Sequence, residues 1–312
     1  MPRQRLTLGT DVRYSFRLDQ DNYDQSPFSQ FLQSRESSIH WGIYAQDEVT
    51  VLSNLILNAG LRYDDYDSFG GTVNPRVALI YAPWKATTLK ALYGTAFRAP
   101  NAYERFYVGP AIKVDPNLGP EKITTYELIL EQVIGAHLRG TVVGFYYKLD
   151  NIINLVTDPE DGLQVFRNSG DIRAKGAELE LEGRWANGIS GRVSYTYQDA
   201  ADAATGQPAP GSAAHVAKAN LILPLWRDRV FLGLEGQYQS RRPLESGGSL
   251  KDFYVANVTL FSVNLPVKGL DLSASIYNLL DTHYRDPAGT ELRQPGIEQD
   301  GRAFRVKLTY GF

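Results

Sequence analysis

The chain has 312 residues and a formal net charge of −3, and it contains no long basic run, so a nucleic-acid partner has no electrostatic support. The lack of cysteine excludes disulfides, thiolate nucleophiles and metal sites with sulfur ligands. No stretch of about 18 apolar residues occurs, which excludes a transmembrane helix and leaves strands as the means of crossing a membrane.

The dominant pattern is the alternation of apolar and polar residues, and it begins with the first segment. In 4–18, apolar side chains such as Leu6, Leu8 and Val12 alternate with polar ones such as Asp11 and Arg13. This period of two is typical of a strand with two different faces. It recurs along the chain in segments of about ten residues. The predicted strands, about fourteen, span 4–18, 36–50, 54–66, 74–82, 87–98, 122–133, 137–149, 172–185, 190–199, 213–225, 229–240, 252–264, 269–280 and 302–312.

The polar face of these segments repeatedly carries charge. Arg62 and Asp64 share that face in 54–66, and Glu178 and Glu180 share it in 172–185. A soluble sandwich needs the reverse, with a dry interior and a polar exterior. The pattern therefore predicts an all-β, antiparallel, up-and-down transmembrane β-barrel with apolar side chains toward lipid and polar ones toward a lumen.

The connections between the predicted strands alternate in length. Since successive connections of an up-and-down barrel lie at opposite ends, all the short ones share one end, as in outer-membrane barrels with short periplasmic turns and longer extracellular loops. The short connections are 51–53, 83–86, 134–136, 186–189, 226–228 and 265–268. The longer or turn-rich connections are 19–35, 67–73, 99–121, 150–171, 200–212, 241–251 and 281–301.

Several short motifs follow one another in a fixed order. They are Asn74-Pro75-Arg76, the YGTAFRAP segment 93–100, 116–122 with Tyr126-Glu127-Leu128, 167–170 with 176–181, and 277–281 with Tyr284. In this order and spacing they resemble the C-terminal barrel of TonB-dependent receptors over roughly residues 40–312. Ile129 departs from the pattern, because the family commonly has Gly there.

The resemblance implies an outer-membrane import receptor of Gram-negative type, whose 22-stranded barrel encloses a plug. No counterpart of the plug domain or the signal peptide is found, so we expect 1–312 to be a single, partial barrel domain with about 14 of the 22 strands. The implied partners are outer-membrane lipid, the barrel assembly machinery, a small nutrient such as a siderophore or cobalamin, and an inner-membrane TonB-type energy-coupling complex, which would act through the missing N-terminal part.

Three groups of residues are candidates for function. Loop residues with aromatic or cationic groups would contact a ligand, or would only pack on their neighbours; they are Tyr103, Arg105, Tyr107, Lys113, Tyr284, Arg285 and Arg293. Charged residues that line the lumen would meet a plug or pair with each other along the wall; they are Arg62, Arg76, Arg98, Glu127, Glu131, Glu178 and Glu180. The last strand resembles the signal read by the assembly machinery, or is an ordinary edge strand; its residues are Phe304, Val306, Leu308, Tyr310 and Phe312.

Catalysis and cofactor binding have no support in the sequence. No nucleophile elbow, P-loop or dinucleotide fingerprint occurs, and the four histidines show no metal spacing. Two acidic clusters, 19–24 and 158–161, offer oxygen ligands but do not complete a calcium loop, so solvated loops are the simpler interpretation. We expect no enzyme activity, no cofactor and no metal.

Two other functions remain open. An even number of strands permits the first and last to pair, which would give an unplugged, passive diffusion pore with fourteen strands. A soluble sugar-binding β-protein is a third possibility, which predicts solubility without detergent.

Overall fold

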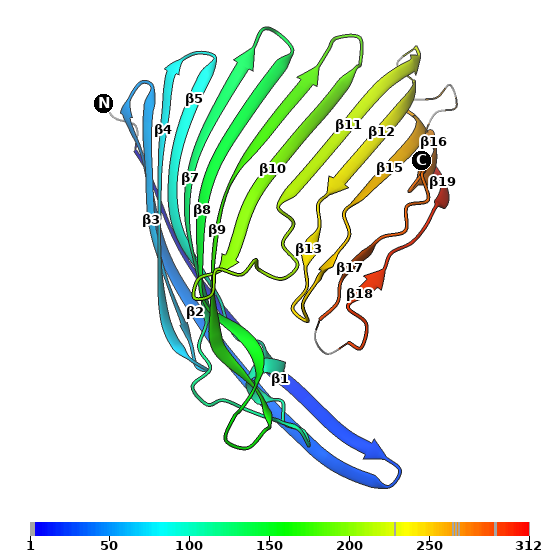
Figure 1. Cartoon of the computed structure of the whole chain (residues 1–312). Coiled ribbons are helices and arrows are strands. Elements are labelled where there is room, and N and C mark those ends of the chain that lie inside the picture. The colour runs from blue at the N-terminus through cyan, green and yellow to red at the C-terminus, as the bar shows by residue number, and fades with distance from the viewer. Residues whose placement is uncertain are drawn as a thin grey trace.

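The computed structural model describes residues 4–227, 229–263, 265, 267, 269–289 and 292–311. Within them, one antiparallel sheet runs through fourteen strands in chain order, and β6 (Ile112–Lys113) joins it by pairing in parallel with β9 (Figure 1). The fourteen strands are β1 (Gln4–Gln25), β2 (Phe28–Leu52), β3 (Leu55–Tyr66), β4 (Gly70–Trp84), β5 (Thr87–Arg98), β7 (Glu121–Ile134), β8 (Leu138–Thr157), β9 (Gln164–Arg184), β10 (Ser190–Asp202), β11 (His215–Trp226), β12 (Val230–Gln239), β15 (Phe253–Ser262), β16 (Leu270–Tyr277) and β19 (Ala303–Tyr310).

The prediction of an all-β, antiparallel sheet is confirmed, and every predicted strand has its counterpart on this path. The remaining elements lie in the predicted loops: α1 (Ala102–Phe106), β13 (Arg242–Pro243), β14 (Ser249–Leu250), β17 (Arg285–Pro287) and β18 (Gly296–Glu298). No helix among the described residues is long and apolar enough to cross a membrane.

Two predicted connections, 19–35 and 150–171, are wrong. β1 and β2 continue as a paired hairpin to a turn at Ser26–Pro27, and β8 and β9 continue to the turn region 158–163. The β1–β2 extension is mostly polar on both faces, and the β8–β9 extension carries adjacent apolar pairs, Ile152-Ile153 and Leu155-Val156, so neither shows the apolar alternation that identifies a strand in lipid. The backbone N–H and C=O groups still need partners there, and the ladder supplies them.

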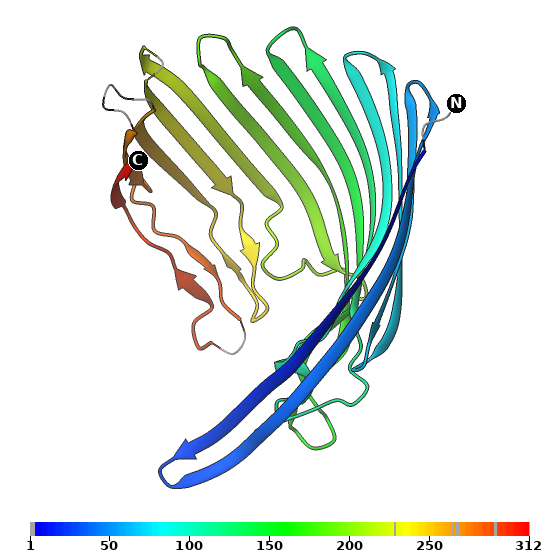
Figure 2. The same cartoon turned by 180° about the vertical axis from the view of Figure 1, so that it is seen from behind.

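The sheet is strongly curved, and its two ends differ (Figures 1 and 2). Short turns lie at one end, and the long connections, with the β1–β2 hairpin projecting beyond them, lie at the other. Across the described residues β1 pairs only with β2, and β19 only with β16, so the sheet is open between β1 and β19.

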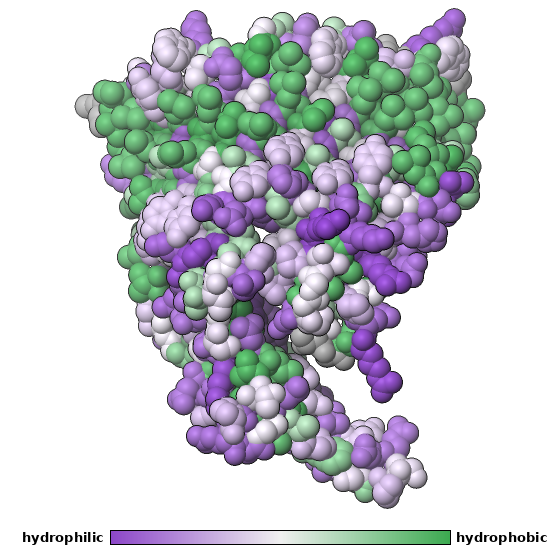
Figure 3. All heavy atoms as spheres, viewed as in Figure 1, coloured by the Kyte–Doolittle hydropathy of each residue, from purple (hydrophilic) through white to green (hydrophobic). Residues whose placement is uncertain are grey.

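The two faces of the sheet separate apolar from polar side chains. The face that carries Leu128, Val193 and Val306, which we call the apolar face, leaves these residues 68%, 56% and 81% exposed. Figure 3 shows hydrophobic residues gathered in a broad band toward the short-turn end and hydrophilic residues toward the long-loop end. The opposite, polar face carries Arg62, Glu131 and the other charged residues predicted to line a lumen.

The buried hydrophobic residues do not form the core of a soluble protein. Only Leu118 and Val165 are large side chains with less than 2% exposure in the described part of the chain, and both lie at the long-loop end. The aliphatic rows therefore do not meet in a dry centre. A soluble sandwich of this size would bury many such side chains, so the soluble alternative is wrong.

Candidate functional site

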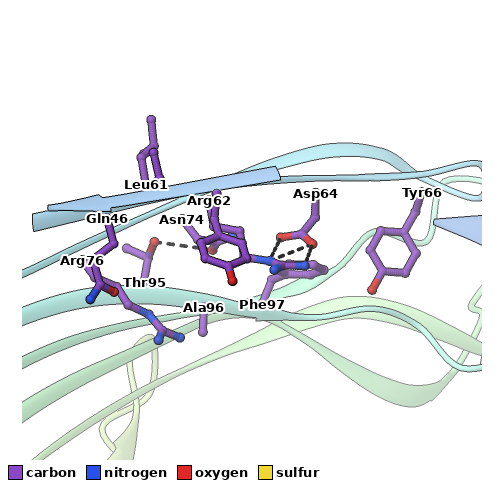
Figure 4. Close-up of a pocket in the computed structure, with 13 residues that line it drawn as sticks. Gln46, Leu61, Arg62, Asp64, Tyr66, Asn74, Arg76, Thr95, Ala96 and Phe97 are labelled. Carbon is purple, nitrogen blue, oxygen red and sulfur yellow. Dashed lines mark hydrogen bonds and ion pairs between the residues drawn. The ribbon is translucent and has the colours of Figure 1, made fainter. Parts of the chain in front are cut away.

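A groove on the polar face is formed by four strands at the start of the sheet. β2, β3, β4 and β5 enclose a cavity of about 530 Å³, with Arg62, Asp64, Asn74 and Arg76 among its polar residues (Figure 4). Leu61 points to the opposite side of β3 in the same view, as the alternation requires. The cavity therefore presents charged and amide groups from consecutive strands.

Arg62 is fixed by two carboxylates. Its guanidinium donates to Asp64 at 2.5–3.0 Å from the same strand, and to Asp11 of β1 at 2.7 Å. Asp64 is 2% exposed, so its negative charge needs this partner. The triad joins β1 to β3 across β2, where Gly42 leaves room for it: a Cβ at Gly42 would lie 2.5 Å from the Arg62 guanidinium.

The groove lies where β4 and β5 separate. Their pairing ends at Arg76 and Gly94, so 70–75 of β4 makes no ladder with β5. Pro75, which has no N–H to donate, stands at this point, consistent with the end of a ladder. Phe97 fills the gap by packing against Tyr66 at 5.7 Å between ring centroids. The gap between β4 and β5 is thus closed by side chains instead of backbone hydrogen bonds.

Arg98 links the wall to the long loop that follows β5. It donates to Glu121 of β7 at 2.6 and 2.8 Å and to Glu104 of α1 at 2.9 and 3.1 Å. Glu104 also completes a capping box with Asn101, in which each side chain accepts from the other residue's backbone N–H. Arg98 and the cap together hold the short helix at the mouth of the sheet.

Two other predicted lumen residues pair along the wall. Glu131 forms ion pairs with Lys90 of β5 at 2.5 Å and with Arg139 of β8 at 2.7 Å. Glu127 accepts a hydrogen bond from the Tyr147 hydroxyl at 2.6 Å. These pairs lie on neighbouring strands, which is the arrangement expected if the wall neutralises its own charges.

The last three predicted lumen residues differ in their partners. Glu180 faces Arg192 of β10 at 3.7 Å. Arg76 and Glu178 are exposed on the polar face, and neither forms an ion pair or hydrogen bond within the described ranges. Wall pairing therefore accounts for most of the predicted lumen charges, and these two remain open to a further partner.

The loop 99–120 carries an aromatic cluster. Tyr103 and Tyr107 lie 4.4 Å apart between ring centroids, and Tyr103 meets Phe166 of the β8–β9 hairpin edge-on at 5.7 Å. The Tyr107 hydroxyl accepts from Asn22 of the β1–β2 hairpin at 2.7 Å. Tyr103 is 49% exposed, so part of this cluster is accessible to a ligand.

The two cationic candidates of that loop, Arg105 and Lys113, already have partners within the protein. Arg105 donates to the Leu118 carbonyl at 2.8 Å. Lys113 binds Asp158 at 2.7 Å and Asp161 at 2.6 Å, and Arg167 reaches Asp158 at 2.6 Å. The hydrogen bond from Lys113 lowers the pKa of Asp158 to about 2. These contacts connect the loop to the β8–β9 hairpin and give Asp158 and Asp161 cationic partners.

The second predicted loop packs around a buried guanidinium. Arg242 is 3% exposed; it donates to Asp286 at 2.6 Å and to the Arg285 carbonyl, and lies 5.1 Å over the Phe253 ring. Tyr284 stacks on Phe253 at 4.3 Å. Tyr284 thus serves the packing of this loop.

The other two predicted residues of this loop are more open. Arg285 approaches Glu298 at 3.8 Å, and both side chains are more than half exposed. Arg293 forms no ion pair or hydrogen bond with the residues that the structure describes. Among the residues that the structure describes, no hydrogen bond, ion pair or ring contact joins this loop to the Tyr103 cluster, so the two predicted ligand groups are separate.

The residues missed from the sequence are partners of the predicted ones, and they include Asp11, Asn22, Phe166 and Arg242. For Asp158, the sequence suggests only calcium binding or a solvated loop. The described residues contain no cluster that could hold a metal ion. The predicted assembly residues of β19, Phe304 to Tyr310, are 59–81% exposed on the apolar face. Phe312, also predicted, lies outside the described residues.

The family model described as "TonB dependent receptor-like, beta-barrel" matches residues 3–279. A vitamin B12 transporter, BtuB, of Vibrio cholerae is 28% identical over 271 residues, covering 82% of this chain and 40% of that protein. A ferric enterobactin receptor of Pseudomonas aeruginosa superposes with a TM-score of 0.79 at 19% identity, over 100% of this chain and 52% of its own. The FrpB iron transporter of Neisseria meningitidis gives a TM-score of 0.75 at 15% identity, over 98% and 52%. The chain thus spans about 40% of the curated relative and half of each solved structure.

Proposed function

The chain belongs to the TonB-dependent receptor β-barrel family, and from that premise we propose that it forms wall and loops of a ligand-gated importer for a scarce nutrient. Proteins of this family reside in the outer membrane of Gram-negative bacteria, and they are transport receptors, not enzymes. The proposed ligand class is a siderophore, a cobalamin or a similar small nutrient.

The observation that carries the proposal is the polarity of the sheet along and across its strands. An apolar band covers one face toward the short-turn end, and the opposite face carries charged pairs such as those of Arg62, Glu131 and Arg98. At the long-loop end, the exposed Tyr103 ring stands above this wall beside Tyr107 and Phe166. An aromatic surface of this kind favours ring-bearing ligands by stacking.

The partners follow from the same proposal. Arg76 and Glu178 face away from lipid without an ion pair in the described part of the wall, so a plug could supply their counter-charges. Movement of such a plug would require a TonB-type inner-membrane complex. The exposed apolar row of β19 is the proposed contact for the assembly machinery.

A passive pore is the second proposal, and the strand number favours it. Fourteen strands place β1 and β19 in opposite directions, so they could pair and close the sheet. Unpaired N–H and C=O groups in lipid cost several kcal/mol each, which drives both edges to find a partner. Large, ungated conductance of the chain in planar bilayers would support the pore, and its absence would favour the importer.

Ligand binding at the Tyr103 cluster tests the main proposal. Cyanocobalamin and a ferric catecholate are titrated separately against the purified chain and against Tyr103→Ala. We expect one of them to bind and the variant to weaken that binding about two- to tenfold, since an aromatic contact contributes about 0.5–1.5 kcal/mol.

Tyr197→Ala is the matched control, because Tyr197 is similarly exposed, at 45%, but lies on the apolar face. Equal affinity of the Tyr103 variant and the unaltered chain would refute the assignment of this cluster.

A further inference from the structure

A group of cations lies on the apolar face of three adjacent strands, near the long-loop end. The register places Lys148 of β8 opposite Arg173 of β9, and Tyr146 opposite Lys175. Lys122 lies four residues before Tyr126 on β7 and shares its face by the period of two. We call these four residues, Lys122, Lys148, Arg173 and Lys175, the outer cation cluster.

The cluster lies directly beyond a row of tyrosines. Tyr93, Tyr126 and Tyr146 are opposite one another on β5, β7 and β8, with centroids 5.2 and 6.3 Å apart. Lys148 Nζ is 5.9 Å from the Tyr126 ring centroid and 5.8 Å from that of Tyr146. Tyrosine rings of this kind mark the boundary between hydrocarbon and headgroups. The cations therefore stand at headgroup level.

The charges of the cluster are incompletely neutralised. Arg173 binds Asp150 at 2.7 Å. Lys175 lies 3.5 Å from Asp199, and the side chains of these two residues are both at least half exposed. Lys148 and Lys122 meet no carboxylate within 4 Å among the residues that the structure describes. Two of the four cations thus form ion pairs with carboxylates, and Asp150, which binds Arg173, is also the residue opposite Lys122 on β8.

Arg173 lies directly opposite Lys148, so the excess of positive charge in the cluster lowers the stability of the isolated chain. Like charges directly opposite each other in an antiparallel pair destabilise the sheet, and Lys148 and Arg173 occupy such a pair. An anion placed between them would reverse the sign of that contribution. A phosphate group fits, because its several oxygens accept hydrogen bonds from both a guanidinium and an ammonium group.

We propose that the outer cation cluster binds the phosphate groups of a phosphorylated glycolipid in the outer leaflet. The acyl chains of that lipid would lie on the aliphatic surface that continues toward the short turns, where Leu128 and Leu179 are 68% and 51% exposed. The site is separate from the import pathway, since these side chains share the face of the tyrosine row and not that of Arg62.

Binding of bisphosphorylated lipid A to the full chain in neutral detergent micelles tests the proposal. Lys148→Gln/Lys175→Gln removes two cations and leaves Arg173 to neutralise Asp150. We expect about thirtyfold weaker binding, which corresponds to about 1 kcal/mol for each cation near a charged membrane surface. Dephosphorylated lipid A is expected to bind the unaltered chain no better than it binds the variant.

The control is Lys85→Gln/Arg227→Gln, which removes one exposed lysine and one exposed arginine from turns at the opposite end. It should change the affinity less than twofold. Circular dichroism checks that all proteins keep their strand content; if the double lysine variant loses it, Lys122→Gln, which breaks no ion pair, replaces it.

Equal affinity of the cluster variant and the unaltered chain would overturn the proposal. So would equal binding of dephosphorylated lipid, or complete displacement of the lipid by excess inorganic phosphate, which would identify a free-anion site instead. The nutrient titration on Tyr103 is independent of all these outcomes, so the two proposals can fail separately.

Discussion

Val142 and Val143 of β8 offer a direct comparison of the two faces of the sheet. Val142 lies on the apolar face opposite Leu130 and Leu179, and it is 43% exposed. Val143 lies on the polar face opposite Glu178. Replacing each with arginine therefore puts the same charge at neighbouring positions of one strand, once toward lipid and once toward the polar wall.

The depth of Val142 sets the expected cost. It lies four residues from Leu138, where β8 begins, and four from Tyr146 of the tyrosine row. At about 3.3 Å per residue and a tilt of about 45°, each interval corresponds to about 9 Å along the membrane normal. Val142 is thus near the middle of the apolar band, where an arginine costs about 2–4 kcal/mol.

Val143→Arg should leave the free energy of unfolding nearly unchanged or raise it slightly. The new guanidinium would face the Glu178 carboxylate, which forms no ion pair among the described residues, and an opposite-charge cross-strand pair contributes about 0.2–1 kcal/mol. The free energy of unfolding is measured by guanidinium titration of the chain in phosphatidylcholine vesicles, with fluorescence of the four tryptophans as the signal. Equal losses at the two positions, or a larger loss at Val143, would refute the two-faced arrangement.

Two further predictions concern the loops and the close packing of the sheet. Lys113 lowers the pKa of Asp158 to about 2, below its value of about 3.9 in an unfolded chain; the stability from their contact is therefore complete above about pH 4 and lost as the pH falls toward 2. Hydrogen exchange of the 158–163 turn should be constant from pH 7 to 5 after correction for the intrinsic rate, whereas a loss of protection near pH 6 would contradict the assignment. At Gly176, a Cβ would lie 2.2 Å from the Tyr197 carbonyl oxygen and 2.5 Å from the Phe145 ring. Gly176→Ala should lower the guanidinium midpoint through about 1–3 kcal/mol of overpacking, with Gly144→Ala, where a Cβ meets nothing within 4 Å, as the tolerated control.

The strands could be predicted because lipid imposes a strong rule on them. Every second residue of a spanning segment must be apolar, as in Phe304, Val306 and Leu308, and that rule is visible in the sequence alone. Where β1 and β2 leave the apolar band, both faces are polar and the rule no longer applies. Their extension to the turn at Ser26–Pro27 depends on the partner strand, which no local pattern reveals.

The partners in the loops could not be predicted for a related reason. Lys113 and Asp158 are 45 positions apart, and Arg242 and Asp286 are 44 apart, so each contact depends on how separate loops fold over the sheet. Residue type indicated that Tyr103 and Lys113 could bind a ligand. Only the structure shows that Lys113 is already paired while Tyr103 keeps an exposed ring.

The separation of the two faces is tested most directly by spin labels along β9. The chain has no native cysteine, so single cysteines can be introduced one at a time at 178–181 and labelled with a nitroxide in reconstituted vesicles. Labels at Leu179 and Leu181 should collide with oxygen dissolved in the bilayer, and labels at Glu178 and Glu180 with a water-soluble nickel complex. The opposite phase, or equal access to both reagents at all four positions, would contradict a membrane wall with its charges turned away from lipid.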